Sequence, residues 1–364
     1  AADSFAVDPC PAWAVLAITF TNKAAQEMKS RLATLIGGDN GESDVLAGTF
    51  HSACLRILRR HADEAGLRSG FTIYDSDDTK RAIIACMKEL GIDDKTLAPR
   101  NVQNTISSAK DRLITPVEFA AAVGNDYNRE RISGIYDLYQ RHLTAANAVD
   151  FDDIIMKTVE LLRGHDEIRD YYNHRFKYVC VDEYQDTNGA QFELIRLLSS
   201  GHHNIMVVGD DDQSIYKFRG AQIENILSFE KNYEGAKVIR LEQNYRSAGN
   251  ILAAANAVIT NNESRMGKQL RTDREAGEKI VIKRLENQNE EARYIVNRIT
   301  ELALREKRKY SDFAVLYRVN AQSGGLEGVF SRSGIPYRIL GGMRFFERKE
   351  VKDILAHLCV INNP

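Results

Sequence analysis

Short apolar runs, each followed directly by polar side chains, recur along the chain and predict buried β-strands. They cover residues 15–20, 45–49, 176–181 and 204–208. Residues 22–36 place apolar side chains at the intervals of an amphipathic helix, and residues 189–199 also suggest a helix. A helix that joins the third and fourth runs would make them neighbours in one parallel sheet. The pattern predicts an α/β fold.

Two further regions follow other patterns. Residues 54–148 carry apolar positions at helical intervals, so we expect a mostly helical segment there. Its basic residues form either a basic face or ordinary solvated surface; they are Lys80, Arg81, Lys110 and Arg112. Later in the chain, we expect strands at 237–241, 279–284, 313–317 and 337–340, and helices over 247–261, 289–305, 322–331 and from 348. This alternation indicates the start of a second α/β domain.

Two adjacent carboxylates, Asp182 and Glu183, follow the third apolar run. In α/β nucleotide hydrolases, carboxylates at this edge of the sheet bind Mg²⁺ and activate the attacking water. The alternative is a strand that simply ends in a polar turn. The fourth run weighs against that alternative, because it also ends in a polar loop, at 209–220, that contains Gln213 with aromatic and basic residues behind it.

The two loops carry long, ungapped motifs. Asp-Glu-Tyr-Gln-Asp-Thr at 182–187 and Gly-Asp-Asp-Asp-Gln-Ser-Ile-Tyr-Lys-Phe-Arg-Gly-Ala at 209–221 resemble two motifs of the UvrD/Rep/PcrA group of superfamily 1 DNA helicases. The resemblance extends over nearly the whole chain. It implies a RecA-like motor domain with a helical insertion, followed by the start of a second RecA-like domain. It also implies ATP and Mg²⁺ as cofactors.

The resemblance assigns roles at the nucleotide. Asp182 would bind Mg²⁺, Glu183 would activate water, and Gln213 would sense the γ-phosphate. Gln-Asn-Tyr-Arg-Ser at 243–247 resembles the family segment that joins the two motor domains. It implies that Tyr245 stacks on adenine and that Arg246, a rigid and permanently charged fork, stabilises charge on the γ-phosphate. The alternative for Arg246 is a surface ion pair.

The resemblance also implies contacts to single-stranded DNA, through Thr-Phe-Thr-Asn-Lys at 19–23, the segment 48–52 and the loop after the fourth run. The implied contact residues are Phe20, Thr21, Asn22, Thr49, His51, Tyr216, Phe218 and Arg219. Polar side chains at a helix N-terminus can bind phosphates, and aromatic rings can stack on bases. The alternatives are a core phenylalanine at Phe20 and a structural histidine at His51.

An acidic cluster at 150–153 looks like the return of the chain to the first motor domain. We interpret it as a helix N-cap with favourable dipole charges rather than a metal site. Two residues depart from the family pattern. Asp211 creates three consecutive aspartates, which either weakens phosphate binding through added negative charge or is a harmless loop variant. Phe218 stands where many members have tryptophan and still offers a ring for stacking.

Composition narrows the class only slightly. The 364 residues carry a net charge of −2, so any nucleic-acid surface must be a local patch. The five cysteines form no C-x-x-C, which argues against a zinc site or a disulfide framework and suits a reducing cytosol. There is no signal peptide and no apolar run of transmembrane length, so we expect a cytoplasmic protein.

A nucleotide motor of this kind needs the phosphate-binding sequence G-x-x-x-x-G-K-[ST]. The 364 residues do not contain it, and their only Gly-Lys, Gly267-Lys268, is followed by Gln269. In the family this segment precedes Thr-Phe-Thr-Asn-Lys, and two further motor motifs follow beyond the equivalent of Pro364. We therefore interpret the chain as a fragment that lacks its P-loop segment, and we expect it to be inactive alone.

We expect residues 1–53 and 149–246 to form the first RecA-like domain, 54–148 the helical insertion, and 247–364 an incomplete second RecA-like domain. The intact protein would be an ATP-dependent 3′–5′ DNA helicase of repair or replication, acting on single strands and on junctions of single and double strands. One alternative is a non-catalytic DNA-binding or protein-interaction remnant. Another is a nuclease-fused relative, although no nuclease motif is visible.

Overall fold

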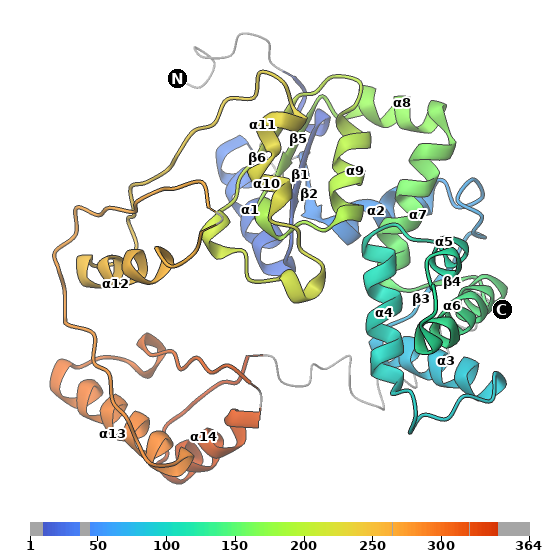
Figure 1. Cartoon of the computed structure of the whole chain (residues 1–364). Coiled ribbons are helices and arrows are strands. Elements are labelled where there is room, and N and C mark those ends of the chain that lie inside the picture. Colours follow the sequence, from blue (N-terminus) through green and yellow to red (C-terminus); the bar gives the residue numbers. More distant parts are fainter. Residues whose placement is uncertain (1–9, 37–43, 264, 320, 341–364) are drawn as a thin grey trace. The chain divides into compact units, whose positions relative to one another are not determined.

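The computed structural model describes residues 10–36, 44–263, 265–319 and 321–340. The chain divides into two compact units. Described residues up to Glu242, together with Val258–Gln269, belong to the first unit, and Gln243–Ala257 with those from Leu270 onward belong to the second. Figure 1 labels the helices and strands of both.

A parallel four-stranded sheet with the order β2-β1-β5-β6 forms the centre of the first unit. Its strands are β1 (Val15–Thr19), β2 (Leu46–Thr49), β5 (Tyr178–Val181) and β6 (Ile205–Val207). Each lies within one of the four apolar runs, so these predictions are confirmed. Ile18 of β1 stands opposite Val181 of β5, which in turn stands opposite Val207 of β6. All four strands therefore end at the same edge of the sheet.

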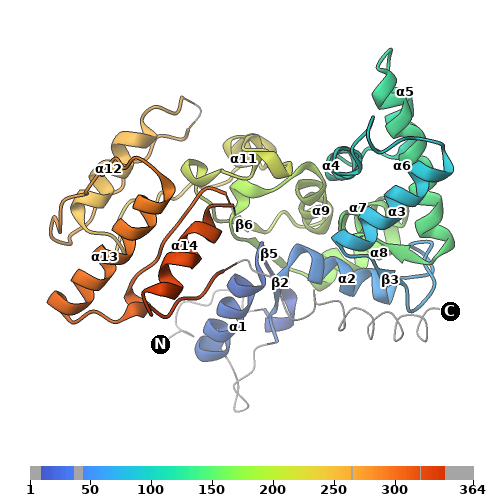
Figure 2. The same cartoon turned by 90° about the horizontal axis from the view of Figure 1, so that it is seen from below.

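Helices cover both faces of this sheet (Figures 1 and 2). The helix α1 (Asn22–Ile36) covers one face, and α2 (Phe50–Arg60), α7 (Phe151–Gly164) and α9 (Gly189–Ser199) cover the other. The predicted helices 22–36 and 189–199 are thus confirmed. Buried side chains of the sheet and of α2, α7 and α9 form one core, among them Ile18, Phe50, Val159, Val181 and Leu194. The unit also contains α8 (Asp166–Arg175), α10 (Glu224–Leu227) and α11 (Phe229–Asn232).

The segment between α2 and α7 is mostly helical, as predicted. It contains α3 (Ser76–Glu89), α4 (Pro99–Asp111), α5 (Pro116–Ala121), α6 (Tyr127–Ala145) and the short parallel strands β3 (Thr72–Ile73) and β4 (Ala148–Val149). It has a hydrophobic core of its own around Ile83, Val102, Ile106 and Ile135.

The prediction that Lys110 lies on the surface of this segment is wrong. Its side chain is fully buried, and its Nζ lies 2.7 Å from Asp150 Oδ2 and 2.8 Å from Asp153 Oδ1. Burial opposes the charged form of Lys110, but the two carboxylates outweigh it and raise its pKa. Asp150 caps α7 by accepting from the backbone N–H of Asp153, which confirms the predicted N-cap. The sequence pattern could not show that this cap also binds a buried lysine.

The second unit contains α12 (Gly249–Ile259) as far as Ala257, α13 (Gln288–Glu306) and α14 (Ala321–Arg332). The three helices predicted in this part of the chain are therefore confirmed. The latter two pack together through Val296, Ile299, Val329 and Phe330. The predicted helix from residue 348 lies outside the described residues.

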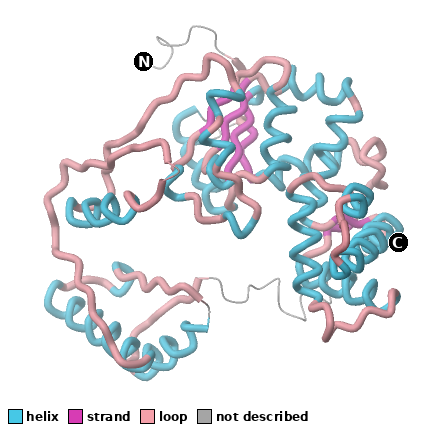
Figure 3. Tube along the Cα trace, in the orientation of Figure 1, coloured by secondary structure: helices cyan, strands magenta, loops and turns pink. Residues whose placement is uncertain are grey.

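The four strands predicted after residue 236 do not form. Figure 3 shows these segments as loops. Among the described residues of this part of the chain, the only β-pairing is the isolated bridge between Gln243 and Arg271. A strand exists through hydrogen bonds to a neighbouring strand, and these segments have none. Ile282 and Leu316 are each 92% exposed, so the apolar pattern that suggested strands is not buried here.

Two further features concern the described residues as a whole. No helix among them combines the length and the apolar character needed to span a membrane. Cys10, Cys54, Cys86 and Cys180 are free thiols, and Cys359 lies outside the described residues.

Candidate nucleotide and DNA site

The carboxyl edge of the sheet brings together residues from four separate segments. β1 ends at Thr19, β2 ends at Thr49, and Asp182 and Asp210 follow β5 and β6. Thr19 and Thr49 are partners in the register, and the backbone N–H of Asp182 donates to the carbonyl oxygen of Ile18 at 2.9 Å. The motifs that follow β1, β2, β5 and β6 therefore lie at one edge of the sheet.

The chain turns sharply after Asp182. Glu183 adopts the left-handed backbone conformation, with φ of 53°, which costs a residue with a side chain about 1–2 kcal/mol. Its side chain is exposed, and its Oε2 accepts a 2.8 Å hydrogen bond from Nε2 of Gln185. Strained backbone of this kind is concentrated at functional sites, so the conformation supports a functional role for this turn.

Gln185 is a buried residue that the sequence analysis did not single out. Its Oε1 accepts from the backbone N–H of Asp210 at 2.9 Å, while its Nε2 holds Glu183. Asp210 Oδ2 in turn accepts from Nε2 of Gln213 at 2.8 Å. A continuous path of hydrogen bonds thus connects Glu183 after β5 with Gln213 after β6. The only signal in the sequence was the position of Gln185 inside the first motif.

The backbone at Gly209 approaches this amide closely. A Cβ added at Gly209 would lie 2.6 Å from Oε1 of Gln185 and 2.8 Å from Cδ1 of Ile226. Real Cβ atoms essentially never show contacts this short, so a side chain would displace the amide or the loop. The absence of a Cβ at Gly209 therefore lets the two loops pack this closely.

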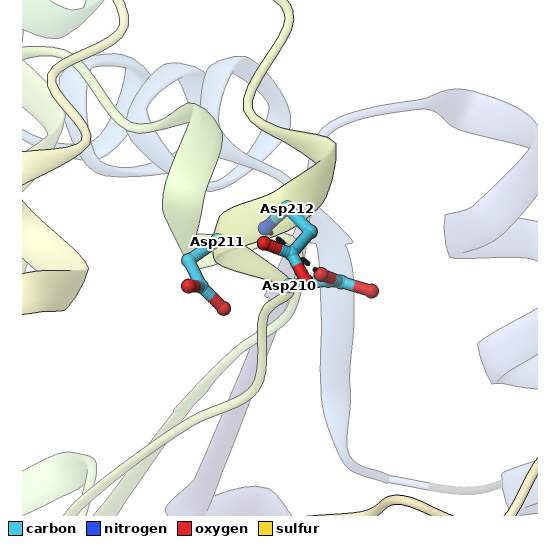
Figure 4. A group of neighbouring side chains, drawn as sticks. All are labelled: Asp210, Asp211 and Asp212. Carbon is cyan, nitrogen blue, oxygen red and sulfur yellow. Dashed lines mark hydrogen bonds between the residues drawn. The ribbon is translucent and has the colours of Figure 1, made fainter. Parts of the chain in front are cut away.

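Three consecutive aspartates follow Gly209, and Figure 4 shows them on one short turn, where the backbone N–H of Asp212 donates to Oδ1 of Asp210 at 3.0 Å. Cations of the chain neutralise them. Lys268 Nζ pairs with Asp210 and, at 2.9 Å, with Asp211. Arg265 binds Asp212 with two hydrogen bonds of 2.9 and 2.7 Å.

Asp211 itself is buried and fully bonded. Burial opposes its ionisation, but the backbone N–H of Met266 and the ammonium group of Lys268 outweigh it and hold its pKa below the usual range. The added negative charge noted in the sequence is therefore largely compensated inside the first unit. Oxygen atoms of the three aspartates lie close enough together to hold a metal ion, but Lys268 and Arg265 already supply positive charge to all three.

Two buried oxygens, one at the end of β1 and one in the turn that follows β5, lack a hydrogen-bond partner among the described residues. Thr19 Oγ1 and Asp186 Oδ1 make no hydrogen bond to any described residue. Burial first, and the charge of Glu183 second, raise the pKa of Asp186 to about 6. Unpaired buried oxygens are costly, so these atoms suggest that water or a ligand completes this edge.

The predicted DNA contacts after β1 and β2 lie at helix N-termini. The backbone N–H of Ala24 donates to Thr21 Oγ1 at 3.1 Å, and Asn22 is the exposed first residue of α1. Thr49 caps α2 by accepting from the backbone N–H of Ser52. These hydroxyl groups therefore have structural roles, whether or not they bind phosphate.

Phe20 and His51 are partly buried side chains. The Phe20 ring lies edge-on to Phe50, with centroids 5.2 Å apart, and packs against the core of the unit. His51 lies edge-on to Phe151 at 5.9 Å, and burial lowers its pKa, which favours the neutral imidazole. Base stacking by Phe20 and phosphate binding by His51 stay predictions.

The turn at residues 216–220, called the 216–220 turn below, exposes two aromatic rings. Tyr216 is 39% exposed and Phe218 is 73% exposed, with their ring centroids 5.9 Å apart and tilted by 37°. Arg219 lies on the same turn and ends a short 3₁₀ helix. Exposed aromatic rings beside basic residues can stack on unpaired bases.

Tyr245 and Arg246 belong to the second unit. Tyr245 is 81% exposed, and the Oδ1 atom of Asn244 accepts from the backbone N–H of Arg246 at 3.0 Å. Arg274 Nη1 donates to the carbonyl oxygen of Arg246 at 2.7 Å. These two hydrogen bonds fix the backbone of Arg246, and the neighbouring Tyr245 ring remains exposed to solvent.

Comparison with known proteins gives a consistent result. Residues 4–234 match the UvrD/REP helicase N-terminal domain, and residues 239–364 match the UvrD-like helicase C-terminal domain. The chain is 47% identical to the ATP-dependent DNA helicase PcrA of Bacillus subtilis over 352 residues, which cover 97% of this chain and 47% of that protein. It is 48% identical to the ATP-dependent DNA helicase UvrD1 of Mycobacterium bovis over 360 residues, 96% of this chain and 46% of the relative.

A PcrA of Staphylococcus epidermidis is 49% identical over 350 residues, 96% of this chain and 47% of the relative. The chain therefore spans about half the length of the curated relatives it matches. Both halves of the chain match the same family, and the relatives resemble it over nearly all of its residues. The chain belongs to the UvrD/REP helicase family.

Proposed function

We propose that the protein built on these residues couples ATP hydrolysis to movement along single-stranded DNA in the 3′ to 5′ direction. It would unwind DNA at junctions of single and double strands, during repair or replication in the cytoplasm. The observation that carries this proposal is the path of hydrogen bonds from Glu183 through Gln185 and Asp210 to Gln213. Such a path links the group that activates water to the group that senses the γ-phosphate.

The edge of the sheet fits Mg²⁺, which prefers hard oxygen ligands and retains several waters. Asp182 supplies a carboxylate, and the buried oxygens of Thr19 and Asp186 have no protein partner among the described residues. We assign Asp182 as the residue that holds the ion. Bound with ATP, the ion would neutralise negative charge on the phosphates.

The residues of the chain have separate tasks in hydrolysis. The Glu183 carboxylate, oriented by Gln185, accepts a proton from the attacking water. Gln213 contacts the γ-phosphate and transmits its presence to the loop after β6. Arg246 stabilises the negative charge that develops on the γ-phosphate, and Tyr245 stacks on the adenine.

DNA binding would involve the loops at the same edge. Tyr216 and Phe218 supply exposed rings, and Arg219 supplies positive charge to the same turn. Thr21, Asn22, Thr49 and His51 lie at or near helix N-termini, where phosphate groups are favoured. Phe20, which lies between β1 and α1, would add an aromatic ring to these contacts.

A second candidate applies to the 364 residues alone: binding of DNA without ATP turnover. It is favoured by the sequence, which contains no G-x-x-x-x-G-K-[ST]. Single-stranded DNA-stimulated ATPase activity, measured on this chain and on the longest natural form of the protein, separates the two candidates.

The sharpest single test is Glu183→Gln in the longest natural form. The amide keeps the size of the side chain but accepts no proton, so ATP turnover should fall at least about 100-fold, the usual contribution of a general base. Binding of ATP and of single-stranded DNA should stay near normal. Retained turnover in this variant would show that Glu183 is not the base.

A further inference from the structure

The end of α4 contacts the loops that follow β5 and β6. Asp111, the last residue of α4, accepts a 2.5 Å hydrogen bond through Oδ1 from the side-chain amide of Asn188. Asn188 caps α9 by accepting from the backbone N–H of Gln191 at 2.9 Å. The helical insertion is thus bonded directly to the segment that begins with Asp182 and Glu183.

The other oxygen of the same carboxylate lies against the 216–220 turn. Gly220 ends this turn with φ of 81°, a left-handed conformation that favours glycine. A Cβ added there would lie 2.9 Å from Oδ2 of Asp111. The Asp111 carboxylate therefore lies close to the backbone of Gly220, where a Cβ would crowd it.

A second glycine shows the same close approach from the side of α9. A Cβ added at Gly189 would lie 3.3 Å from the carbonyl oxygen of Asp111. The exit of the 216–220 turn is bonded to the same region, because the backbone N–H of Gln222 donates to the carbonyl oxygen of Thr187 at 2.9 Å. Asn225 Nδ2 also donates to Thr187 Oγ1 at 3.0 Å. The end of α4, residues 187–189 and the 216–220 turn form one packed junction.

The residue before Asp111 fixes α4 on its other side. Lys110 is buried between Asp150 and Asp153 at the start of α7. Two consecutive residues therefore bind the end of α4 to the sheet-covering helix α7 and to the two loops. The end of α4 is thereby linked through residues 187–189 to the segment that follows the 216–220 turn.

We propose that Asp111 is a positioning residue that sets the 216–220 turn, and with it the rings of Tyr216 and Phe218, for binding single-stranded DNA. The DNA part of this inference rests on the proposed function. Asp111 touches no DNA in this account; it acts through Asn188 and Gly220. The helical insertion would thereby influence the affinity of the first unit for single-stranded DNA.

The carboxyl group at this position behaves partly as a neutral acceptor. Burial first, and the charge of Asp152 second, raise the pKa of Asp111 to about 7. An asparagine has the same shape and can still accept the hydrogen bond from Asn188. Asp111→Asn should therefore preserve the junction, whereas Asp111→Ala removes both contacts.

The first measurement follows the turn itself and needs no DNA. Trypsin cleaves after Lys217 and Arg219, and mass spectrometry of the native 364-residue chain reports how often the turn opens. We expect cleavage about tenfold faster in Asp111→Ala than in the wild type, roughly the effect of losing one buried hydrogen bond. Asp111→Asn should cleave within about twofold of the wild type. Asp94→Ala, which removes an exposed carboxylate of the same insertion, is the matched control and should change nothing.

The second measurement is the affinity of the same chain for a fluorescently labelled oligothymidylate. We expect about tenfold weaker binding for Asp111→Ala, with rescue by Asp111→Asn and no effect of Asp94→Ala. Equal cleavage of the turn in Asp111→Ala and the wild type overturns the positioning role. If the turn opens faster in Asp111→Ala but the wild type binds no oligothymidylate, the positioning role is supported and the proposed DNA function is refuted. A turn that opens with unchanged DNA affinity refutes the link between the junction and DNA.

Gly220→Ala provides a second check, directed at the contact between the turn and Asp111. The added methyl group should displace the turn and speed its cleavage, because it meets Oδ2 of Asp111. In the double variant with Asp111→Ala, the effect of Gly220→Ala should be smaller, since the clash is gone and only the backbone strain remains. Strictly additive effects would contradict the contact.

Discussion

Nε2 of Gln185 donates a 2.8 Å hydrogen bond to Oε2 of Glu183, and this bond joins two residues of one motif whose roles differ. Glu183 is exposed and is the proposed base, whereas Gln185 is buried and also bonds the backbone of Asp210. A left-handed turn alone would leave the Glu183 side chain free to rotate. Gln185 therefore holds the Glu183 carboxylate in one orientation through this hydrogen bond.

Gln185→Met tests this relationship. Methionine matches the length of glutamine but holds neither Glu183 nor the N–H of Asp210, so kcat for ATP should fall about tenfold or more while KM changes little. Steady-state ATPase assays with single-stranded DNA on the longest natural form measure both constants. Gln26→Met, at an exposed position of α1, is the control and should behave as the wild type. An unchanged kcat would remove Gln185 from the mechanism.

Lys110→Met should destabilise the first unit strongly. The substitution leaves Asp150 and Asp153 buried without their cation, which typically costs about 3–5 kcal/mol. Urea denaturation followed by circular dichroism measures the loss. Lys80→Met removes an exposed lysine of α3 in the same insertion and should change stability by less than about 0.5 kcal/mol. Similar losses in both variants would mean that the buried ion pairs contribute little.

Phe218→Ala should weaken binding of single-stranded DNA. The ring is 73% exposed, so its removal costs little packing but deletes a stacking surface worth about 1–3 kcal/mol per base. Anisotropy titrations with oligothymidylate should show the loss, and thermal denaturation should show an unchanged midpoint. Ile215→Ala, also exposed and adjacent to the turn, serves as the control. Equal affinities of Phe218→Ala and the wild type would exclude stacking by this ring.

Asp186 should make stability depend on pH. Its folded pKa of about 6 lies above the ordinary value of 3.8 for an aspartate, so the folded state binds the proton more tightly. Its contribution is fully present below pH 3.8 and is lost as the pH rises through 6. Relative to Asp186→Asn, the wild type should therefore lose stability between these pH values.

Thermal midpoints of the wild type and of Asp186→Asn are measured at each pH across this range. In the difference between the two midpoints, the titration of all other groups cancels. The gap should widen in favour of Asp186→Asn as the pH rises. A constant gap would show that Asp186 titrates normally in the folded protein. The unpaired Oδ1 atom would then need another explanation, such as a bound water.

The sequence by itself determined the elements of the first unit and the edge at which the site lies. The strands β1, β2, β5 and β6 are short apolar runs, a pattern typical of a parallel sheet with helices on both faces, although β6 is only partly buried. Parallel strands share one carboxyl edge, so Asp182 and Asp210 had to lie at the same side of the sheet. Local pattern and topology suffice for these conclusions.

Tertiary structure alone decided the partners of the polar side chains. Lys110 and Lys80 look alike in sequence, yet one is buried between two carboxylates and the other faces water. The predicted strands after residue 236 failed for the same reason, because a strand needs a partner that the local sequence does not encode. Gln185, Lys268 and Asp111 acquire their roles from contacts with residues distant in sequence. Such contacts depend on which surfaces meet when the chain folds, and no periodicity in the sequence records them.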